Sequence, residues 1–248
     1  MMAEKEDIFR GKDGILYCAI CKEPKEAYYP VDSIMGGKKH PRLCRCEREE
    51  RDRLQRYYKE KEALEQIDRY KRICFREKEM RTYTFQGLVE ESYLVEGYAI
   101  QQAKAYVLNW HVKKKEGCLL WGPDKSGKSY LACCVANALI ENGIQVKMTT
   151  IGTVLQEMSK VKSKPEYVTS LMRYELLIVD KIGSEVYEKY VLESLLYLLD
   201  YRYQTHRPLV LISTVSVTQM ETETDFLKRR IYRRILQMCR PLYIYEKG

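Results

Sequence analysis

Apolar runs and polar, helix-forming segments alternate along the chain from about residue 83 onward. Five apolar runs have the length and composition of buried strands: GCLLW (117–121), IQVKMTT (144–150), ELLIVD (175–180), PLVLIST (208–214) and PLYIY (241–245). Helices are predicted between these runs, near residues 129–142, 151–160, 186–205 and 217–239. Buried strands that alternate with helices favour an α/β fold, in which a mainly parallel sheet is covered on both faces.

The segment that precedes this region has a different pattern. Residues 47–80 contain no glycine or proline and predict one long, charged helix. An interrupted apolar stripe runs along this helix, formed by Leu54, Tyr57, Leu64, Ile67 and Cys74. The stripe is too patchy for a coiled coil, so a connector helix that rests on its neighbour is the favoured interpretation. The predicted organisation is a cysteine-rich module at 1–46, a connector helix at 47–80 and an α/β domain at 81–248.

The composition describes a globular protein with one substantial core and room for a small second module. Of the 248 residues, 45% are apolar and 31% are charged, and no apolar run approaches the roughly 20 residues that span a bilayer. The N-terminal sequence MMAEKEDIFRGKDG lacks the pattern of a secretory signal, so a cytoplasmic protein without membrane contact is expected. The net charge of +8 permits contact with nucleic acid but does not demonstrate it.

A glycine-rich loop follows the first strand of the α/β domain. The segment GPDKSGKS fits the G-x-x-x-x-G-K-S spacing of a phosphate-binding loop, with a strand before it and an amphipathic helix after it. The glycines allow the backbone to wrap phosphate, and the helix directs its positive end at the same anion. The predicted nucleotide-binding residues are Gly122, Pro123, Asp124, Lys125, Ser126, Gly127, Lys128 and Ser129.

Two residues of this loop have predicted roles toward ATP and its magnesium ion. Lys128 is placed to reach the β- and γ-phosphates, and Ser129 supplies a hydroxyl to Mg²⁺. Lys125 stands where a third glycine is frequent, which predicts a stiffer or more cationic loop. Nucleotide binding is the strongest single inference from the sequence.

The strand ELLIVD ends at Asp180, about fifty residues after Lys128, which is a usual distance for the carboxylate that holds Mg²⁺. A second carboxylate normally follows and polarises the attacking water, but the next residue here is Lys181. Glu185 is the nearest carboxylate that could substitute. A residue at a helix N-terminus, favoured there by the helix dipole, is the preferred interpretation of Glu185.

The end of the following strand departs from the common pattern as well. Such ATPases often carry an asparagine there to orient water, and Val215 occupies that position in LISTVS (211–216). Ser213 and Thr214 are weaker candidates for the same role. Because two catalytic positions are altered together, ATP binding is predicted to be sound and hydrolysis to be impaired.

Four of the nine cysteines cluster near the N-terminus. Cys18 and Cys21 form a C-x-x-C, and Cys44 and Cys46 form a C-x-C after 22 intervening residues. Two close thiol pairs predict a tetrahedral Zn²⁺ site, with His40 as an alternative ligand, that organises a segment too small for its own core. The competing interpretation is four unrelated thiols. The other cysteines are interpreted as buried small residues: Cys74, Cys118, Cys133, Cys134 and Cys239.

The order of the segments GPDKSGKS, LLIVDKIGSE, YLLDYRYQTHRPLVLISTVS and LKRRIYRRILQMC resembles the DnaC/IstB family of AAA+ ATPases, over roughly residues 80–248. The resemblance implies a P-loop NTPase fold of the AAA+/ASCE type with a parallel five-stranded sheet. It also implies a helicase loader of bacteria, phages or mobile elements, or an ATP-dependent helper of a transposase.

Family members assemble so that an arginine of each subunit reaches the nucleotide of its neighbour. On this resemblance Arg234 matches the arginine-finger position, and Arg230, one turn earlier, is the second choice. The crowding of Arg229, Arg230, Arg233 and Arg234 leaves a second interpretation open, in which this basic helix face contacts nucleic acid phosphates.

The N-terminal module has parallels in phage-type relatives, which carry a zinc knuckle before a long charged helix. In helicase loaders such a module typically grips the replicative helicase, so partner binding is the favoured interpretation. Direct contact with single-stranded DNA is the competitor, because basic and aromatic residues surround the second cysteine pair. These residues are Tyr28, Tyr29, Lys38, Lys39, Arg42, Arg45 and Arg48.

Three functional hypotheses follow from these features. The leading one is a helicase-loader-like protein in DNA replication that binds ATP·Mg²⁺, self-associates on DNA and delivers a replicative helicase. The second is an IstB-like helper that uses ATP in transposition, with a transposase as partner. The third is a nucleotide-dependent scaffold without hydrolysis, which Lys181 and Val215 favour.

Overall fold

The computed structural model describes residues 8–90, 97–110, 116–161, 163–183 and 189–245. It contains two structural units, Met1–Glu65 and Gln66–Gly248. The boundary between them falls inside the helix α1 (Arg45–Cys74). None of the helices in the described ranges is long and apolar enough to cross a lipid bilayer.

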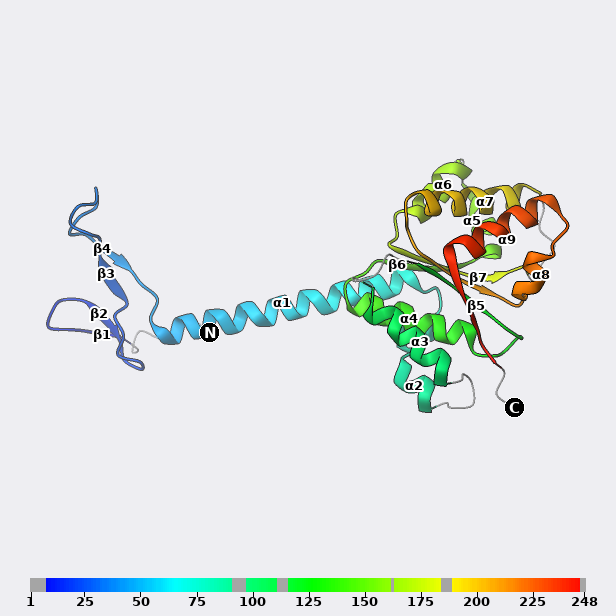
Figure 1. Ribbon diagram of the computed structural model, residues 1–248. Coiled ribbons are helices and arrows are strands. Elements are labelled where there is room, and N and C mark those ends of the chain that lie inside the picture. The colour runs from blue at the N-terminus through cyan, green and yellow to red at the C-terminus, as the bar shows by residue number, and fades with distance from the viewer. Residues whose placement is uncertain (1–7, 91–96, 111–115, 162, 184–188, 246–248) are drawn as a thin grey trace. The chain divides into compact units, whose positions relative to one another are not determined.

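The first unit is built from two short hairpins and the start of α1 (Figure 1). β1 (Ile8–Arg10) pairs antiparallel with β2 (Leu16–Cys18), and β3 (Glu26–Tyr28) pairs antiparallel with β4 (Lys39–Pro41). Among the described residues of this unit, Cys18 and Cys44 are the buried ones. A segment that buries so little apolar surface needs another source of stability, and its cysteines are the side chains able to supply one.

The predicted helix over 47–80 is shorter in the structure. α1 begins at Arg45 and ends at Cys74, and a 3₁₀ turn, η1 (Glu79–Thr82), follows a short non-helical stretch. Cys74 and Phe75 are both fully buried, at 0% and 1% exposure. The helix therefore ends where the chain enters the core of the second unit.

The apolar stripe of α1 is divided between core and solvent. Ile67 and Cys74 belong to the core of the second unit, while Leu54, Tyr57 and Leu64 are exposed. The end of the helix is fixed to that unit by polar contacts as well, since Lys71 Nζ lies 2.8 Å from Glu141 Oε1. The last turns of the predicted connector therefore rest on the second unit, while its first turn pairs with the hairpin region through Glu47–Lys25 and Arg48–Glu23, both at 2.8 Å.

The second unit contains a five-stranded, entirely parallel sheet in the order β6-β7-β8-β5-β9. Its strands are β5 (Gly117–Trp121), β6 (Val146–Thr150), β7 (Leu176–Ile182), β8 (Leu209–Ser213) and β9 (Cys239–Tyr243). All five coincide with predicted strands, although β9 begins two residues earlier than predicted. The order places β8 between β5 and β7, so the ends of those two strands flank the end of β8.

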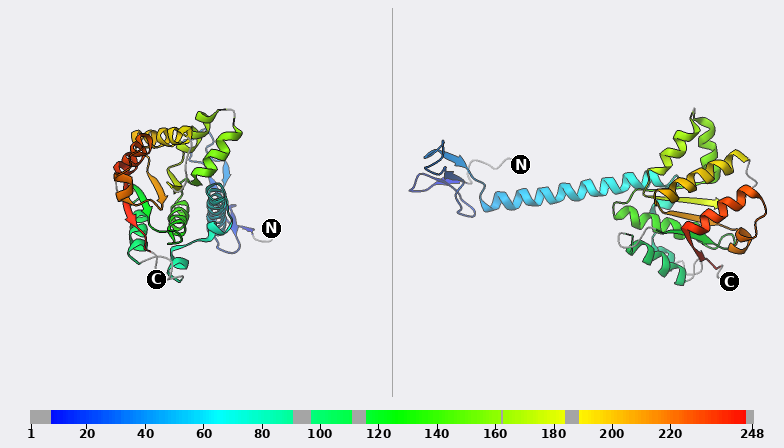
Figure 2. Two further views of the ribbon diagram at one scale, coloured as in Figure 1. Left: turned by 90° about the vertical axis from the view of Figure 1, so that its right-hand side faces the viewer. Right: turned by 45° about the horizontal axis from the view of Figure 1, so that its top comes forward.

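Helices cover both faces of the sheet (Figures 1 and 2). They are α2 (Phe85–Glu90), α3 (Gly97–Leu108), α4 (Lys128–Glu141), α5 (Ile151–Lys160), α6 (Lys164–Met172), α7 (Lys189–Gln204), α8 (Val217–Glu221) and α9 (Phe226–Met238). Leu176 and Ile178 of β7 pack in the core with α3 and α4, whereas Leu177 and Val179 pack in the core with α5, α7 and α9. Burial on both faces explains why the strands read as continuous apolar runs.

Two helical predictions differ from the structure. The predicted helix 217–239 is two helices, because Asp225 accepts hydrogen bonds from the backbone of Leu227 and Lys228 and starts α9 anew. α6 was not predicted, although its N-cap Ser163 accepts a hydrogen bond from Glu166 N. The predicted helix 186–205 corresponds to α7, whose described residues begin at Lys189.

A buried arginine joins α7 to the edge of the sheet where β7 and β8 begin. Arg202 is fully buried, at 0% exposure. Its guanidinium donates to the carbonyl oxygens of Tyr174, Glu175 and Pro208 at 3.1, 3.0 and 2.6 Å. These bonds fix the starts of the two strands whose opposite ends carry the candidate site.

Candidate nucleotide-binding site

The predicted phosphate loop connects β5 to α4. Gly122 has φ 150°, and a Cβ added there would lie 2.3 Å from the carbonyl oxygen of Ile244, so this position excludes any side chain. Gly127 has φ 81° and caps α4 in the left-handed region. Lys125 also has a positive φ, 61°, which a non-glycine residue adopts at a cost of about 1 kcal/mol. The loop thus turns back on itself and ends at the N-terminus of a helix of 14 residues.

Lys128 lies inside this loop rather than in solvent. Its ammonium donates to the carbonyl of Gly122 at 3.0 Å, to the carbonyl of Pro123 and to Ser126 Oγ at 3.2 Å. The side chain is 6% exposed. Burial lowers the pKa of Lys128, and the carboxylates of Asp124 and Asp180 oppose that shift. The loop therefore encloses a cation next to the backbone amides at the start of α4, which is the arrangement that binds phosphate.

Ser129 and Asp180 meet at the foot of the loop. The Ser129 hydroxyl donates to Asp180 Oδ2 at 2.7 Å, and Asp180 is buried at 7% exposure. The other carboxylate oxygen, Oδ1, accepts from the backbone N–H of Lys181 at 2.7 Å. A hydroxyl and a carboxylate are oxygen ligands of the kind that Mg²⁺ prefers, so the donor set fits a magnesium ion beside bound phosphates.

Lys181 occupies an irregularity in the sheet. Val179 of β7 pairs with Leu211 of β8, and Ile182 pairs with Ser213, so two residues of β7 stand opposite one residue of β8. Lys181 adopts φ 60° at this bulge, and its side chain is exposed. The position expected to hold a second carboxylate thus carries a cationic side chain on a strained backbone. Glu185, the predicted substitute, lies outside the described residues.

The end of β8 provides a hydroxyl that is engaged in structural hydrogen bonds. Ser213 Oγ donates to the carbonyl of Ile182 at 2.7 Å and accepts from the backbone N–H of Val215 at 3.0 Å. Val215 packs against Gly183, where a Cβ would lie 2.6 Å from Val215 Cγ2. Thr214 is exposed. Ser213 therefore holds the bulged end of β7 in place.

The two arginines predicted as candidates for the arginine finger, Arg234 and Arg230, differ in their surroundings. Arg234 Nε donates to Asp200 Oδ1 of α7 at 2.7 Å, and its guanidinium carbon lies 4.1 Å from the ring centre of Tyr203. Arg230 is exposed, with its guanidinium carbon 6.0 Å from the Phe226 ring. Arg234 is thus held by α7 of its own chain, a contact that sequence reasoning did not anticipate, and Arg230 points to solvent.

The four N-terminal cysteines come together in the first unit. The Sγ atoms of Cys18, Cys21, Cys44 and Cys46 all lie within 4.8 Å of one another. Hydrogen bonds from the backbone N–H groups of Cys46 and Glu23 lower the pKa of Cys21 to about 6, while burial raises the pKa of Cys44 to about 12. Four thiols at this spacing fit a tetrahedral Zn²⁺ ion with Zn–S bonds of about 2.3 Å.

His40 is not part of this cluster, and its ring packs against Tyr29 with the ring centres 4.6 Å apart. Of the five remaining cysteines, Cys74, Cys133, Cys134 and Cys239 are buried as predicted. Cys118 is half-buried, because it borders a cavity between α3 and the sheet.

Parallel strands in this order, with a phosphate loop after β5 and a carboxylate near the end of β7, define a P-loop ATPase of the AAA+ class. Residues 57–245 match the family described as IstB-like ATP binding protein. The chain belongs to that family.

Curated relatives match over shorter regions. The replicative helicase loader DnaC of Escherichia coli (strain K12) is 25% identical over 119 residues, which cover 46% of this chain and 47% of that protein. An insertion sequence ATP-binding protein of Sinorhizobium fredii (strain NBRC 101917 / NGR234) is 30% identical over 94 residues, which cover 37% of this chain and 32% of that protein. The chain spans less than half the length of these relatives.

Solved structures share the fold. The crystal structure of DnaI covers 73% of this chain and 100% of its own, with a TM-score of 0.59 at 19% identity. The crystal structure of the DnaC helicase loader matches 68% of this chain and 100% of its own chain, with a TM-score of 0.56 at 16% identity. The structure of AMPPCP-bound DnaA from Aquifex aeolicus matches 65% of this chain and 50% of its own chain, with a TM-score of 0.52 at 17% identity. At these identities the likeness establishes the AAA+ fold alone.

Proposed function

We propose that the chain binds ATP with Mg²⁺ at the loop from Gly122 to Ser129. Lys128 leaves its carbonyl partners for the β- and γ-phosphates, and Ser129 and Asp180 hold the metal. The observation that carries this proposal is the 2.7 Å contact between Ser129 Oγ and Asp180 Oδ2, because it brings two hard oxygen donors to the foot of the loop.

In the cell, the chain acts as a helicase loader in DNA replication. It self-associates on single-stranded DNA and delivers a replicative helicase, with residues 1–46 as the partner-binding module, 47–80 as the connector and 81–248 as the ATPase domain. The similarity to the E. coli helicase loader supports this role. A role as transposition helper is the second candidate, which the family match and the S. fredii relative favour.

Capture of partners from the host separates these two roles. The full chain with an affinity tag is recovered in the presence of a slowly hydrolysed ATP analogue, beside Lys128→Ala as a control with weakened nucleotide binding. Enrichment of a replicative helicase with the unmodified chain alone supports the loader role. Enrichment of a transposase instead supports the second role, and no nucleotide-dependent partner contradicts both.

The arginines of α9 act in trans on the nucleotide of a neighbouring subunit. Arg230 is exposed and available to a second copy as the chain stands, whereas Arg234 first has to leave Asp200. Sedimentation of the protein with and without ATP tests this role. Arg230→Ala or Arg234→Ala is expected to weaken ATP-dependent assembly without changing ATP affinity in the monomer, and unchanged assembly of both variants contradicts it.

ATP is bound but turned over slowly. Lys181 stands beside Asp180 where a water-polarising carboxylate is expected, and the Ser213 hydroxyl is occupied by Ile182 and Val215. Glu185, or a carboxylate of a neighbouring subunit, is the remaining candidate base. Turnover measured with and without single-stranded DNA separates a slow ATPase from a nucleotide-dependent scaffold.

The N-terminal module binds one Zn²⁺ through Cys18, Cys21, Cys44 and Cys46. The closeness of the four thiols and the small buried core of this unit support the proposal. The metal orders the two hairpins and the start of α1, and the ordered module contacts the helicase. Direct contact with single-stranded DNA is the alternative role of the same module.

A further inference from the structure

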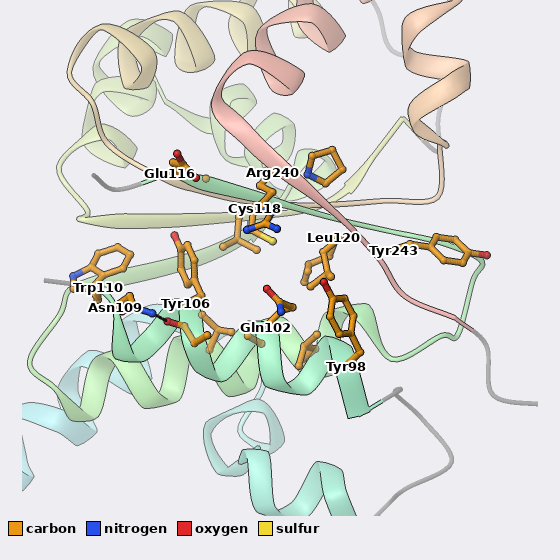
Figure 3. Close-up of a pocket in the computed structure, with 18 of the residues that line it drawn as sticks. Tyr98, Gln102, Tyr106, Asn109, Trp110, Glu116, Cys118, Leu120, Arg240 and Tyr243 are labelled. Atoms are coloured by element: carbon orange, nitrogen blue, oxygen red, sulfur yellow. Dashed lines mark hydrogen bonds between the residues drawn. The ribbon is translucent and has the colours of Figure 1, made fainter. Parts of the chain in front are cut away.

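A cavity of about 440 Å³ lies between α3 and the sheet (Figure 3). α3 forms one wall, and β5 and the edge strand β9 form the other. None of the residues Gly122–Ser129 lines it. Pockets of roughly 300–1,000 Å³ accommodate small organic molecules, so the cavity has the size of a ligand site.

The floor and walls of the cavity are mainly apolar. Ala103 of α3, Leu120 of β5 and Leu131 of α4 are buried at its inner surface. Aromatic rings stand at both ends, with Tyr98 and Tyr243 at one end and Tyr106 and Trp110 at the other (Figure 3). Such a surface favours an aromatic or aliphatic body.

Tyr106, which lines the cavity, carries a buried hydroxyl. Its Oη has no hydrogen-bond partner among the described residues, and the side chain rises from α3 toward the sheet (Figure 3). Burial raises the pKa of Tyr106, so the hydroxyl keeps its proton and remains a donor. A buried donor without an acceptor is unfavourable, and an acceptor on a bound molecule would remove that cost.

Arg240 adds a positive charge to the same cavity. It pairs in register with Cys118 across β9 and β5, and its guanidinium points toward α3 (Figure 3). Within the described ranges, no carboxylate forms an ion pair with Arg240. Glu116, which also lines the cavity, is exposed to solvent at its rim. An arginine beside an apolar cavity favours a ligand whose acidic group lies at one end of an apolar body.

We propose that this cavity binds a small amphiphilic organic anion. The aromatic or aliphatic body of the ligand lies between α3 and the sheet, and its carboxylate or sulfonate pairs with Arg240. The Tyr106 hydroxyl turns from its buried position to donate to an oxygen of the ligand. Gln102, which points into the same space, supplies a further polar contact (Figure 3). The proposal does not depend on the proposed ATP chemistry, because no residue of the loop Gly122–Ser129 lines the cavity.

Two fluorescent probes of nearly equal shape test the proposal on the full chain. 1-Anilinonaphthalene-8-sulfonate carries the acidic group, and N-phenyl-1-naphthylamine is its neutral analogue. We expect one saturable site per chain with a preference for the anion. Arg240→Gln should weaken binding of the anionic probe about tenfold and leave binding of the neutral probe nearly unchanged, because the substitution removes the charge-assisted hydrogen bond to the sulfonate.

Two further variants test whether the probes bind in this cavity. Gln102→Trp fills the cavity from a half-buried position and should abolish binding of both probes, while Arg233→Gln, on the exposed face of α9, is the charge-matched control and should change neither. Circular dichroism confirms that each variant is folded. Absence of saturable binding, or equal affinities in the unmodified chain, Arg240→Gln and Gln102→Trp, overturns the proposal.

Discussion

The hydroxyl of Ser129, in the first turn of α4, donates a hydrogen bond to Asp180 Oδ2, near the end of β7, across 51 positions of sequence and 2.7 Å of space. The contact exists because β5 and β7 run parallel on either side of β8, so their carboxyl ends lie at the same edge of the sheet. The second oxygen of Asp180 is held by the backbone of Lys181. The geometry of the proposed metal site therefore depends on the bulge that contains Lys181.

Replacing Lys181 by glycine is expected to stabilise the protein by up to about 1 kcal/mol, because glycine adopts φ 60° without the steric cost that a lysine bears. Urea unfolding of both proteins measures the difference. Lys160→Gly, at the last residue of α5, is the matched control and should destabilise the protein slightly, by less than the roughly 1 kcal/mol that glycine costs in a helix interior. A loss of stability in Lys181→Gly would show that this residue is not strained.

Replacing Lys181 by aspartate restores a carboxylate next to Asp180. If the lysine limits hydrolysis, Lys181→Asp should raise the steady-state rate of ATP turnover, and Lys128→Ala added to it should abolish the gain. ATP affinity is measured in parallel, since the phosphate contacts are unchanged. A turnover rate that stays at the level of the unmodified protein would indicate that the carboxylate has to come from elsewhere.

Asp200 and Arg234 should be coupled in stability. Both side chains are about one quarter exposed, at 29% and 27%, and the guanidinium also lies over Tyr203. A double-mutant cycle with Asp200→Asn and Arg234→Gln is expected to give an interaction free energy of about 1 kcal/mol. In the matched cycle, Asp200→Asn with Arg230→Gln should give a value near zero. Equal coupling in both cycles would contradict the specific pairing.

Arg202 should be the most sensitive arginine for folding. Arg202→Met leaves the carbonyls of Tyr174, Glu175 and Pro208 without their donor, and a loss of about 3 kcal/mol in the free energy of unfolding is expected. Arg207→Met, at the half-buried neighbour that bonds Met172 and Arg173, should cost less. Denaturant unfolding ranks the two, and a larger loss for Arg207→Met would refute the assignment.

The protein purified under reducing conditions should contain one zinc ion per chain by elemental analysis. Cys18→Ser and Cys46→Ser should each lose the metal, and chelation should remove the ordered structure of the first unit. Cys118→Ser, which alters a half-buried cysteine of β5, is the control and should retain it. Zinc-free protein with an intact first unit would argue for four unrelated thiols.

The strands and the site were readable from sequence for the same physical reason. Strands buried on both faces need continuous apolar runs, so the segment ELLIVD predicts β7. A phosphate loop needs glycines at fixed positions, so the segment GPDKSGKS predicts where the loop begins and ends. Parallel strands bring their carboxyl ends together, which made the meeting of the loop with Asp180 foreseeable.

Other features depend on tertiary contacts that local patterns do not encode. The left-handed conformation of Lys181 results from the register of β7 against β8, and the Asp200 partner of Arg234 lies on a different helix. The predicted helix 217–239 continued through Asp225 because its polar pattern is compatible with a helix, although the side chain serves as a cap. The cavity below β9 arises from how α3 packs on the sheet, so Tyr106 and Arg240 gave no signal in the sequence.

The measurement that tests the central claim most directly is the affinity for ATP, titrated calorimetrically with Mg²⁺ and with chelator. We expect the unmodified chain to bind ATP more tightly with Mg²⁺. Lys128→Ala should weaken binding about tenfold or more, and Asp180→Asn should remove the Mg²⁺ dependence while retaining the metal-free affinity. An unmodified chain that binds no ATP, or that binds equally well after Lys128→Ala, would contradict the account.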